Sequence, residues 1–133
     1  MLSIIMKVKT DTKEKFHAIT VETGFLSANM AAELADQLVP LLHSANRNLV
    51  LNLKAVNGMD EGAAESLVKL QQHFYEQQAS FVICELSDEL DRFLDEANLL
   101  ELMNTTQTES EAWDIVQMEE IERELMDDAT DTM

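Results

Sequence analysis

The chain has 133 residues, with nine basic and 26 acidic side chains and a formal net charge of -17 at pH 7. This length suits one domain with a single modest core. The charge argues against binding to nucleic acid or to an anionic membrane surface, because both need a basic footprint. The acidic residues are concentrated toward the C-terminus, since residues 101–133 hold eleven acidic side chains and one basic one, Arg123.

Two short strands are predicted near the start, over residues 3–9 and 16–22, joined by a polar link over residues 10–15. They are expected to pair antiparallel. The first residues lack the charged segment of a signal peptide, and their apolar run is too short to span a membrane. We therefore expect a cytoplasmic protein without direct membrane insertion.

An amphipathic helix follows, with Ser27 or Asn29 as its N-cap. Pro40 removes one amide near its end and should bend or shorten the last turn. Because this helix lies between two strands, a parallel crossover is expected. Its apolar stripe consists of Met30, Ala31, Leu34, Ala35, Leu38, Leu41 and Leu42.

The central stretch, residues 49–70, changes from a strand pattern to a helix pattern. A nearly continuous apolar run over residues 49–53 predicts a strand covered on both faces. Asn57 and Gly58 then form a turn that tolerates positive φ. A helix is expected from Asp60, which would cap it, while Glu61 adds a second anion at the positive helix end. The helix stripe consists of Ala64, Leu67, Val68, Gln71, Phe74 and Tyr75.

The second half continues the alternation of strands and helices. A buried strand is predicted over residues 81–86, and it contains the lone cysteine, Cys84, as an inert core thiol. Ser87 should cap the next helix and Asn98 should end it. Residues 99–103 are expected to form the last, edge strand.

The final helix should begin at Glu109, because Thr108 and Glu111 have the spacing of a capping box. Its inner face would use Ala112, Trp113, Ile115 and Val116. Beyond Gln117 the apolar residues thin out among carboxylates. We expect a helical acidic extension over residues 118–133, disordered from about residue 129.

The segment VLNLKAVNGMDEGAAESLVKL, residues 50–70, resembles the central motif of the STAS domain family (sulfate transporter and anti-sigma factor antagonist). In that motif a strand is followed by a hydrophobic residue and then by Asp and Ser. The next position is either Ser or Thr, and a Gly completes the motif at the opening of a helix. Met59 and Asp60 match the first two positions, whereas Glu61 stands where phospho-regulated members carry the phosphorylated serine. Asn52 stands where the family commonly has a strand aspartate.

The element order of residues 87–113 is also similar to the closing half of STAS domains. The resemblance covers about residues 1–117 and implies a single α/β STAS-like domain. We expect a mixed sheet of about five strands with helices mostly on one face, followed by the acidic extension over residues 118–133.

In STAS proteins the exposed turn around the motif serine docks the partner, an anti-sigma factor with a kinase fold, and phosphorylation expels that partner. The resemblance therefore implies a non-catalytic regulator similar to an anti-sigma factor antagonist. A partner with basic residues at its docking site would complement the carboxylates. The expected partner-binding residues are Asn57, Gly58, Asp60, Glu61, Gly62, Glu65, Ser66 and Lys69.

Three interpretations of Glu61 stay open at this point. It is a favourable first-turn residue in a domain without phospho-switching, or it holds the domain in a phospho-like state, or it meets a basic partner directly. Ser66, one turn further along, is a displaced candidate for phosphorylation.

No catalytic, metal or cofactor site is predicted. His17, His43 and His73 are isolated from other metal ligands, and the chain has neither a glycine-rich phosphate loop nor a nucleophile elbow. The alternatives to an antagonist are a STAS subunit of a membrane transporter complex and a small-molecule or nucleotide sensor. A homodimer is also possible.

Overall fold

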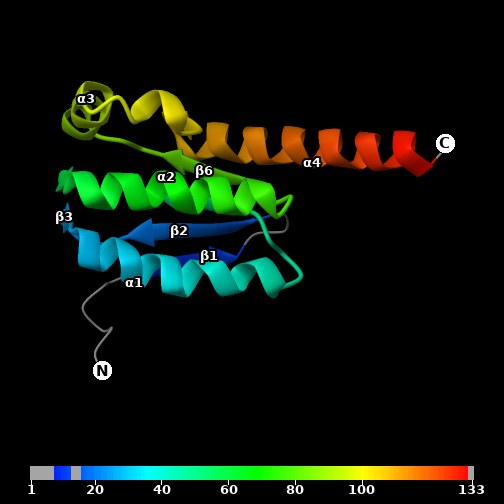
Figure 1. The fold of residues 1–133 in the computed structure, drawn as a ribbon, viewed down its shortest axis with the longest axis horizontal. Helices are drawn as coiled ribbons and strands as arrows, with labels where there is room; N and C mark the ends of the chain where they lie inside the picture. The colour runs from blue at the N-terminus through cyan, green and yellow to red at the C-terminus, as the bar shows by residue number, and fades with distance from the viewer. Residues whose placement is uncertain (1–7, 13–15, 132–133) are drawn as a thin grey trace.

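A mixed five-stranded sheet forms the centre of the molecule (Figure 1), in the order β1-β2-β4-β6-β7. The computed structural model describes residues 8–12 and 16–131, with side chains over residues 16–126. The strands are β1 (Val8–Thr12), β2 (His17–Val21), β4 (Leu49–Asn52), β6 (Phe81–Cys84) and β7 (Thr105–Thr106). β1 pairs antiparallel with β2 and the other neighbours are parallel, which confirms the predicted mixed sheet of about five strands.

Helices cover both faces of the sheet, but unequally. Successive strand residues point to opposite faces, so each strand contributes to two separate core clusters. Ile19, Leu51 and Ile83 belong to the larger core cluster, which α1 (Ala28–Leu38), α2 (Glu61–Glu76) and α3 (Asp88–Glu96) complete. Val50 and Val82 belong to a smaller cluster that is covered by α4 (Glu109–Asp131). The helices therefore lie mostly on one face, as expected.

The helix caps follow the local sequence signals. The Ser27 hydroxyl accepts from the Met30 amide at 3.2 Å, and the Ser87 hydroxyl accepts from the Leu90 amide at 3.1 Å. Thr108 and Glu111 form a reciprocal capping box, with Glu111 N–H donating to Thr108 Oγ1 at 3.1 Å and Thr108 N–H donating to Glu111 Oε1 at 3.0 Å. The expected N-cap and capping-box positions are thereby confirmed.

Two further expectations about helix ends are met. Pro40 lies in η2 (Val39–His43), a 3₁₀ helix that continues α1 and so shortens its α-helical part. Asn98 takes a left-handed conformation with φ 61°, which ends α3.

The predicted extent of the first hairpin link and the predicted position of the last strand are wrong. β1 begins at Val8 and reaches Thr12, so it includes residues that we expected in the hairpin link, while most of the predicted range lies outside the described residues. Residues 99–103 contain η3 (Leu100–Leu102) instead of a strand, and the last strand is β7. There the Leu99 amide donates to Leu94 O and the Met103 amide to Leu100 O, so local helical turns take the hydrogen bonds that a ladder would need.

A second, two-stranded parallel sheet was not predicted. It pairs β3 (Phe25–Leu26) with β5 (Gly58–Met59). Each strand is only two residues long, too short to produce an alternating pattern in the sequence. This small sheet joins the chain before α1 to the chain before α2.

α4 runs without a break from Glu109 to Asp131 and extends past the ends of the strands (Figure 1). The boundary predicted at residue 117 falls within this helix, and that boundary and a partly disordered end stay predictions. Trp113 is 45% exposed, so its expected place on the inner face is wrong, whereas Ala112 and Val116 are fully buried. Its ring instead lies beside the Phe16 ring in a tilted arrangement, with centroids 6.2 Å apart.

Candidate functional site

The turn before α2 is fixed by backbone hydrogen bonds to the turn before α1. Gly24 O accepts from the amides of Asn57 at 2.8 Å and Gly58 at 3.3 Å, and Leu26 O accepts from the amide of Asp60 at 3.1 Å. The two helices therefore begin side by side at the carboxyl ends of the parallel strands. In parallel α/β sheets this end is where ligands and partners are most often met.

Asp60 links the two helix starts by a contact that the sequence did not predict. It occupies the N-cap position of α2 but makes no capping hydrogen bond to its own helix. Its Oδ2 accepts instead from the amide of Ala28, the first residue of α1, at 3.1 Å. The expected capping of α2 by this side chain is wrong, because the neighbouring helix offers an amide to the same carboxylate. The carboxylate holds two helix ends together.

The glycines of this region are explained by close approach and not by positive φ. Neither Asn57 nor Gly58 has positive φ; the described residues with positive φ are Gln78, Glu85 and Asn98. The expected use of that conformation at the turn is therefore wrong. A Cβ on Gly58 would lie 3.3 Å from the ring of Phe25, and one on Gly62 would lie 3.3 Å from Ala28 Cβ. A larger residue at either position would have to displace its neighbour by a few tenths of an ångström.

The structure places the predicted partner-binding residues on one continuous stretch of turn and helix, and we call these eight residues the turn surface. Its exposed members are Asn57, Asp60, Glu61, Glu65 and Lys69. Gly58, Gly62 and Ser66 are partly buried, so Ser66 is only partly accessible to a modifying enzyme. Three of the exposed side chains are carboxylates, which makes the start of α2 acidic.

Phe25 is a surface residue that the sequence analysis missed. Its side chain is 52% exposed, although it lies in β3 directly beside Gly58. An aromatic ring next to a rim of carboxylates is the composition of a protein-binding patch, where aromatic anchors supply much of the binding energy. The only sequence signal for it was an apolar residue directly after Gly24.

Asn52, at the end of β4, is buried at 4% exposure, and both ends of its side-chain amide form hydrogen bonds. Its Oδ1 accepts from the Lys54 amide at 2.9 Å, and its Nδ2 donates to Glu109 Oε1 at 3.1 Å. The amide side chain thus shapes the chain leaving β4 and ties it to the first turn of α4. An aspartate here could not donate to Glu109.

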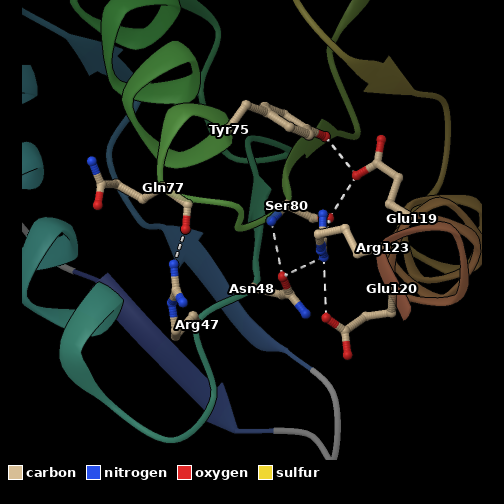
Figure 2. Close-up of polar contacts among 8 residues, drawn as sticks. All are labelled: Arg47, Asn48, Tyr75, Gln77, Ser80, Glu119, Glu120 and Arg123. Atoms are coloured by element: carbon tan, nitrogen blue, oxygen red, sulfur yellow. Dashed lines mark hydrogen bonds and ion pairs between the residues drawn. The ribbon is translucent and has the colours of Figure 1, made fainter. Parts of the chain in front are cut away.

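At the opposite end of the sheet a network of polar side chains fixes α4 (Figure 2). Arg123 donates to Asn48 Oδ1 at 3.2 Å and to Ser80 Oγ at 3.0 Å. Glu119 Oε1 accepts from the Tyr75 hydroxyl at 2.8 Å and from Ser80 Oγ at 2.6 Å. Burial, reinforced by Glu119, raises the pKa of the Tyr75 phenol well above its usual value. We call these five residues the anchor network.

A hollow of about 640 Å³ lies next to this network, between α2 and the chain around Asn104. Three of the polar side chains on its wall already have partners: Gln71 Nε2 donates to Phe81 O at 2.7 Å, and Asn104 Nδ2 donates to the Tyr75 hydroxyl at 2.6 Å. The hollow is broad and open, and the exposed side chains of Gln72 and Glu76 also line it.

Side chains that could bind a metal ion are not clustered in the described part of the chain. Residues 16–126 contain no group of three or more His, Cys, Asp or Glu side chains that could hold a metal ion. Cys84 is completely buried, and burial together with Glu109 and Glu85 raises the pKa of its thiol to about 12. A thiol in this environment is protonated at neutral pH and unreactive. No helix in the described ranges is long and apolar enough to cross a membrane.

Comparison with solved structures places the fold among STAS domains. A STAS-domain protein described as an anti-sigma-factor antagonist from Planctomyces limnophilus has 19% sequence identity and a TM-score of 0.67, over 79% of this chain and 93% of that one. A variant of RsbS from Moorella thermoacetica, in which a serine is replaced by glutamate, has 18% identity and a TM-score of 0.69, over 84% and 95% of the two chains.

The mouse anion transporter Slc26a9 is also similar, with 11% identity and a TM-score of 0.68; the match covers 81% of this chain and 18% of the transporter. No curated protein matches this sequence. The family model of the STAS domain matches residues 6–112, most of the chain. With this match, the element order and the motif at Asp60, the chain belongs to the STAS domain family.

Proposed function

We propose that this chain is a non-catalytic regulator that binds a protein partner through the turn surface, in the manner of an anti-sigma factor antagonist. One observation carries the proposal: the start of α2 presents exposed carboxylates beside the half-exposed Phe25, on a frame fixed by backbone hydrogen bonds. A rigid patch of this kind loses little conformational entropy when a partner binds. The fold shared with anti-sigma factor antagonists supports the same role.

The partner is an anti-sigma factor with a kinase fold, and its docking site combines an apolar pocket with basic side chains. Phe25 would fill the pocket, while Glu61 and Glu65 would face the basic residues. Such opposite charges increase the association rate and reject other partners more than they add affinity. Lys69, one helical turn beyond Glu65, marks the edge of the acidic region.

Glu61 gives this surface a permanent negative charge at the position where related antagonists are phosphorylated. A phosphoserine would carry about -1.5 to -2 charges and three acceptor oxygens, whereas a carboxylate carries one charge and two oxygens. We infer that Glu61 contacts the basic side chains of the partner directly and that binding is not switched at this residue.

An affinity pull-down from the native cell extract tests the proposal, with partners identified by mass spectrometry. The wild type is compared with Glu61→Ser and with Glu89→Ser, a matched control in the first turn of α3. We expect the wild type and Glu89→Ser to capture a kinase-like anti-sigma factor, and Glu61→Ser to capture it more weakly. Capture by Glu61→Ser alone would mean that the charge repels the partner, and capture by none of the three would remove the antagonist role.

Phe25→Asp provides a second test of the same surface. It should reduce capture at least about tenfold, as expected when an aromatic anchor is lost from an interface. Leu102→Asp is the matched control, because Leu102 is 54% exposed and lies away from the turn surface in η3. Equal capture by Phe25→Asp and Leu102→Asp would contradict a docking role for the start of α2.

A second candidate function is supported by the similarity to the mouse anion transporter. In that case the chain is a STAS subunit that docks on the cytoplasmic face of a membrane transport complex. Copurification with membranes, followed by crosslinking from the turn surface to a transporter subunit, would favour this function over the antagonist role.

A further inference from the structure

The exposed side of α4 carries a row of apolar residues that the fold leaves uncovered. Met118 is 58% exposed, Ile121 is 56% exposed and Leu125 is 62% exposed. Their spacing of three and then four residues places them on one side of the helix. We call these three residues the outer stripe. It is independent of the turn surface, which lies at the other end of the strands.

The anchor network prevents α4 from turning this stripe inward. Arg123 and Glu119 hold the opposite side of the helix to Asn48, Ser80 and Tyr75, which come from three separate places in the chain (Figure 2). Val116 and Ala112, about one and two turns before Glu119, are fully buried against the sheet. A rotation that buried the outer stripe would break all of these contacts. The stripe is therefore held outward by the fold itself.

The charges around the outer stripe define what can cover it. Asp114, Glu122 and Glu124 are exposed on α4. Arg123, the one basic residue in residues 101–133, already donates to Asn48, Ser80 and Glu120. A small hollow of about 150 Å³ beside Ile121 is lined by Glu120 and Glu124, within reach of a long basic side chain. Apolar residues surrounded by carboxylates complement an apolar row flanked by lysine or arginine.

We propose that the outer stripe is a second docking surface, which binds a basic amphipathic helix of another protein. A helix laid along α4 would cover Met118, Ile121 and Leu125 with its apolar face and place its basic residues against the acidic flanks. A second copy of this chain is disfavoured as the occupant. Its outer stripe has the same acidic flanks, and like charges brought together in an interface oppose binding.

Three synthetic helical peptides separate apolar docking from simple charge attraction. Each has about 18 residues, which at 1.5 Å per residue is long enough to cover the outer stripe. The first combines leucine at helical spacing with lysine, the second replaces its leucines with serine at the same charge, and the third replaces its lysines with glutamate. Binding is measured by fluorescence anisotropy at an ionic strength of about 0.15 M, where exposed charges are well screened. The leucine–lysine peptide should bind at least about tenfold more tightly than either of the others.

Two protein variants locate the binding site. Ile121→Asp should weaken binding of the leucine–lysine peptide at least about tenfold, which corresponds to about 1.4 kcal/mol. Gln72→Asp adds the same charge at an exposed position of α2 and should leave binding unchanged. Circular dichroism and thermal unfolding confirm that both variants remain folded, as expected for exposed positions.

Three results would overturn the proposal. Equal binding by Ile121→Asp and wild type would mean that the peptide is attracted by net charge alone. Sedimentation equilibrium that finds a wild-type dimer, dissociated by Ile121→Asp, would assign the stripe to a second copy of this chain. Tight binding of the serine–lysine peptide would likewise contradict apolar docking.

Discussion

The two ends of the sheet are held by different kinds of contact. At the carboxyl ends of the strands, backbone amides of the turn surface donate hydrogen bonds to the carbonyls of Gly24 and Leu26, and Leu26 itself is fully buried in the larger core. At the amino ends, α4 is held by the side chains of the anchor network. The turn surface is thus joined to the larger core through the backbone, whereas the second half of α4 is attached through side chains. Substitutions at the turn end should therefore affect the whole domain, and those in the anchor network should affect mainly α4.

Leu26→Ala should give the largest effect. Removing a fully buried leucine costs about 2–5 kcal/mol of unfolding free energy, because it loses burial and leaves a cavity. Urea denaturation followed by circular dichroism measures the change. Leu102→Ala, at an exposed position, should change the free energy by no more than about 0.5 kcal/mol. Similar losses for the two variants would show that β3 is not part of the cooperative core.

Arg123→Met should have an intermediate effect confined to one region. It keeps much of the side-chain length but removes the donors to Asn48 and Ser80, which should cost about 1–3 kcal/mol. Hydrogen exchange should become faster in the second half of α4 and stay unchanged in α2. Arg92→Met on exposed α3 is the control. Faster exchange throughout the domain would mean that the two ends are not separate.

Cys84 predicts an effect that is absent at neutral pH and appears only in alkaline solution. Its thiol pKa is about 12 in the folded protein and about 8.5 in an unfolded chain, so between these values the unfolded state loses a proton that the folded state keeps. Stability should therefore fall as pH rises through this range, by about 1.4 kcal/mol per pH unit from this residue. Cys84→Ala should show a shallower decline, measured by urea denaturation at several pH values. Identical slopes would exclude this origin.

Features set by neighbouring residues could be predicted from the sequence. The Ser27 and Ser87 caps and the capping box at Thr108 each depend on groups three residues apart, so the local pattern contains the whole interaction. The buried strands β4 and β6 were also evident, because continuous apolar runs have few other structural explanations.

Contacts between distant parts of the chain could not be predicted in the same way. Asp60 was assigned to its own helix, but it accepts from Ala28, 32 residues away. Arg123 was identified only as a lone basic residue, yet it bonds Asn48 across 75 positions. The eight residues of the turn surface are close in sequence and lie together in space. Phe25 lies beside them only because β3 pairs with β5, which the sequence did not predict.

The complete burial of Cys84 also makes the protein suitable for thiol-specific labelling. Since the chain has no other cysteine, the folded wild type should not react with a maleimide dye, and unfolding should expose a single reactive group. A cysteine introduced at an exposed position such as Gln72 or Glu122 would then be the sole labelled site of the folded chain. Fluorophores at these two positions would report separately on α2 and on α4.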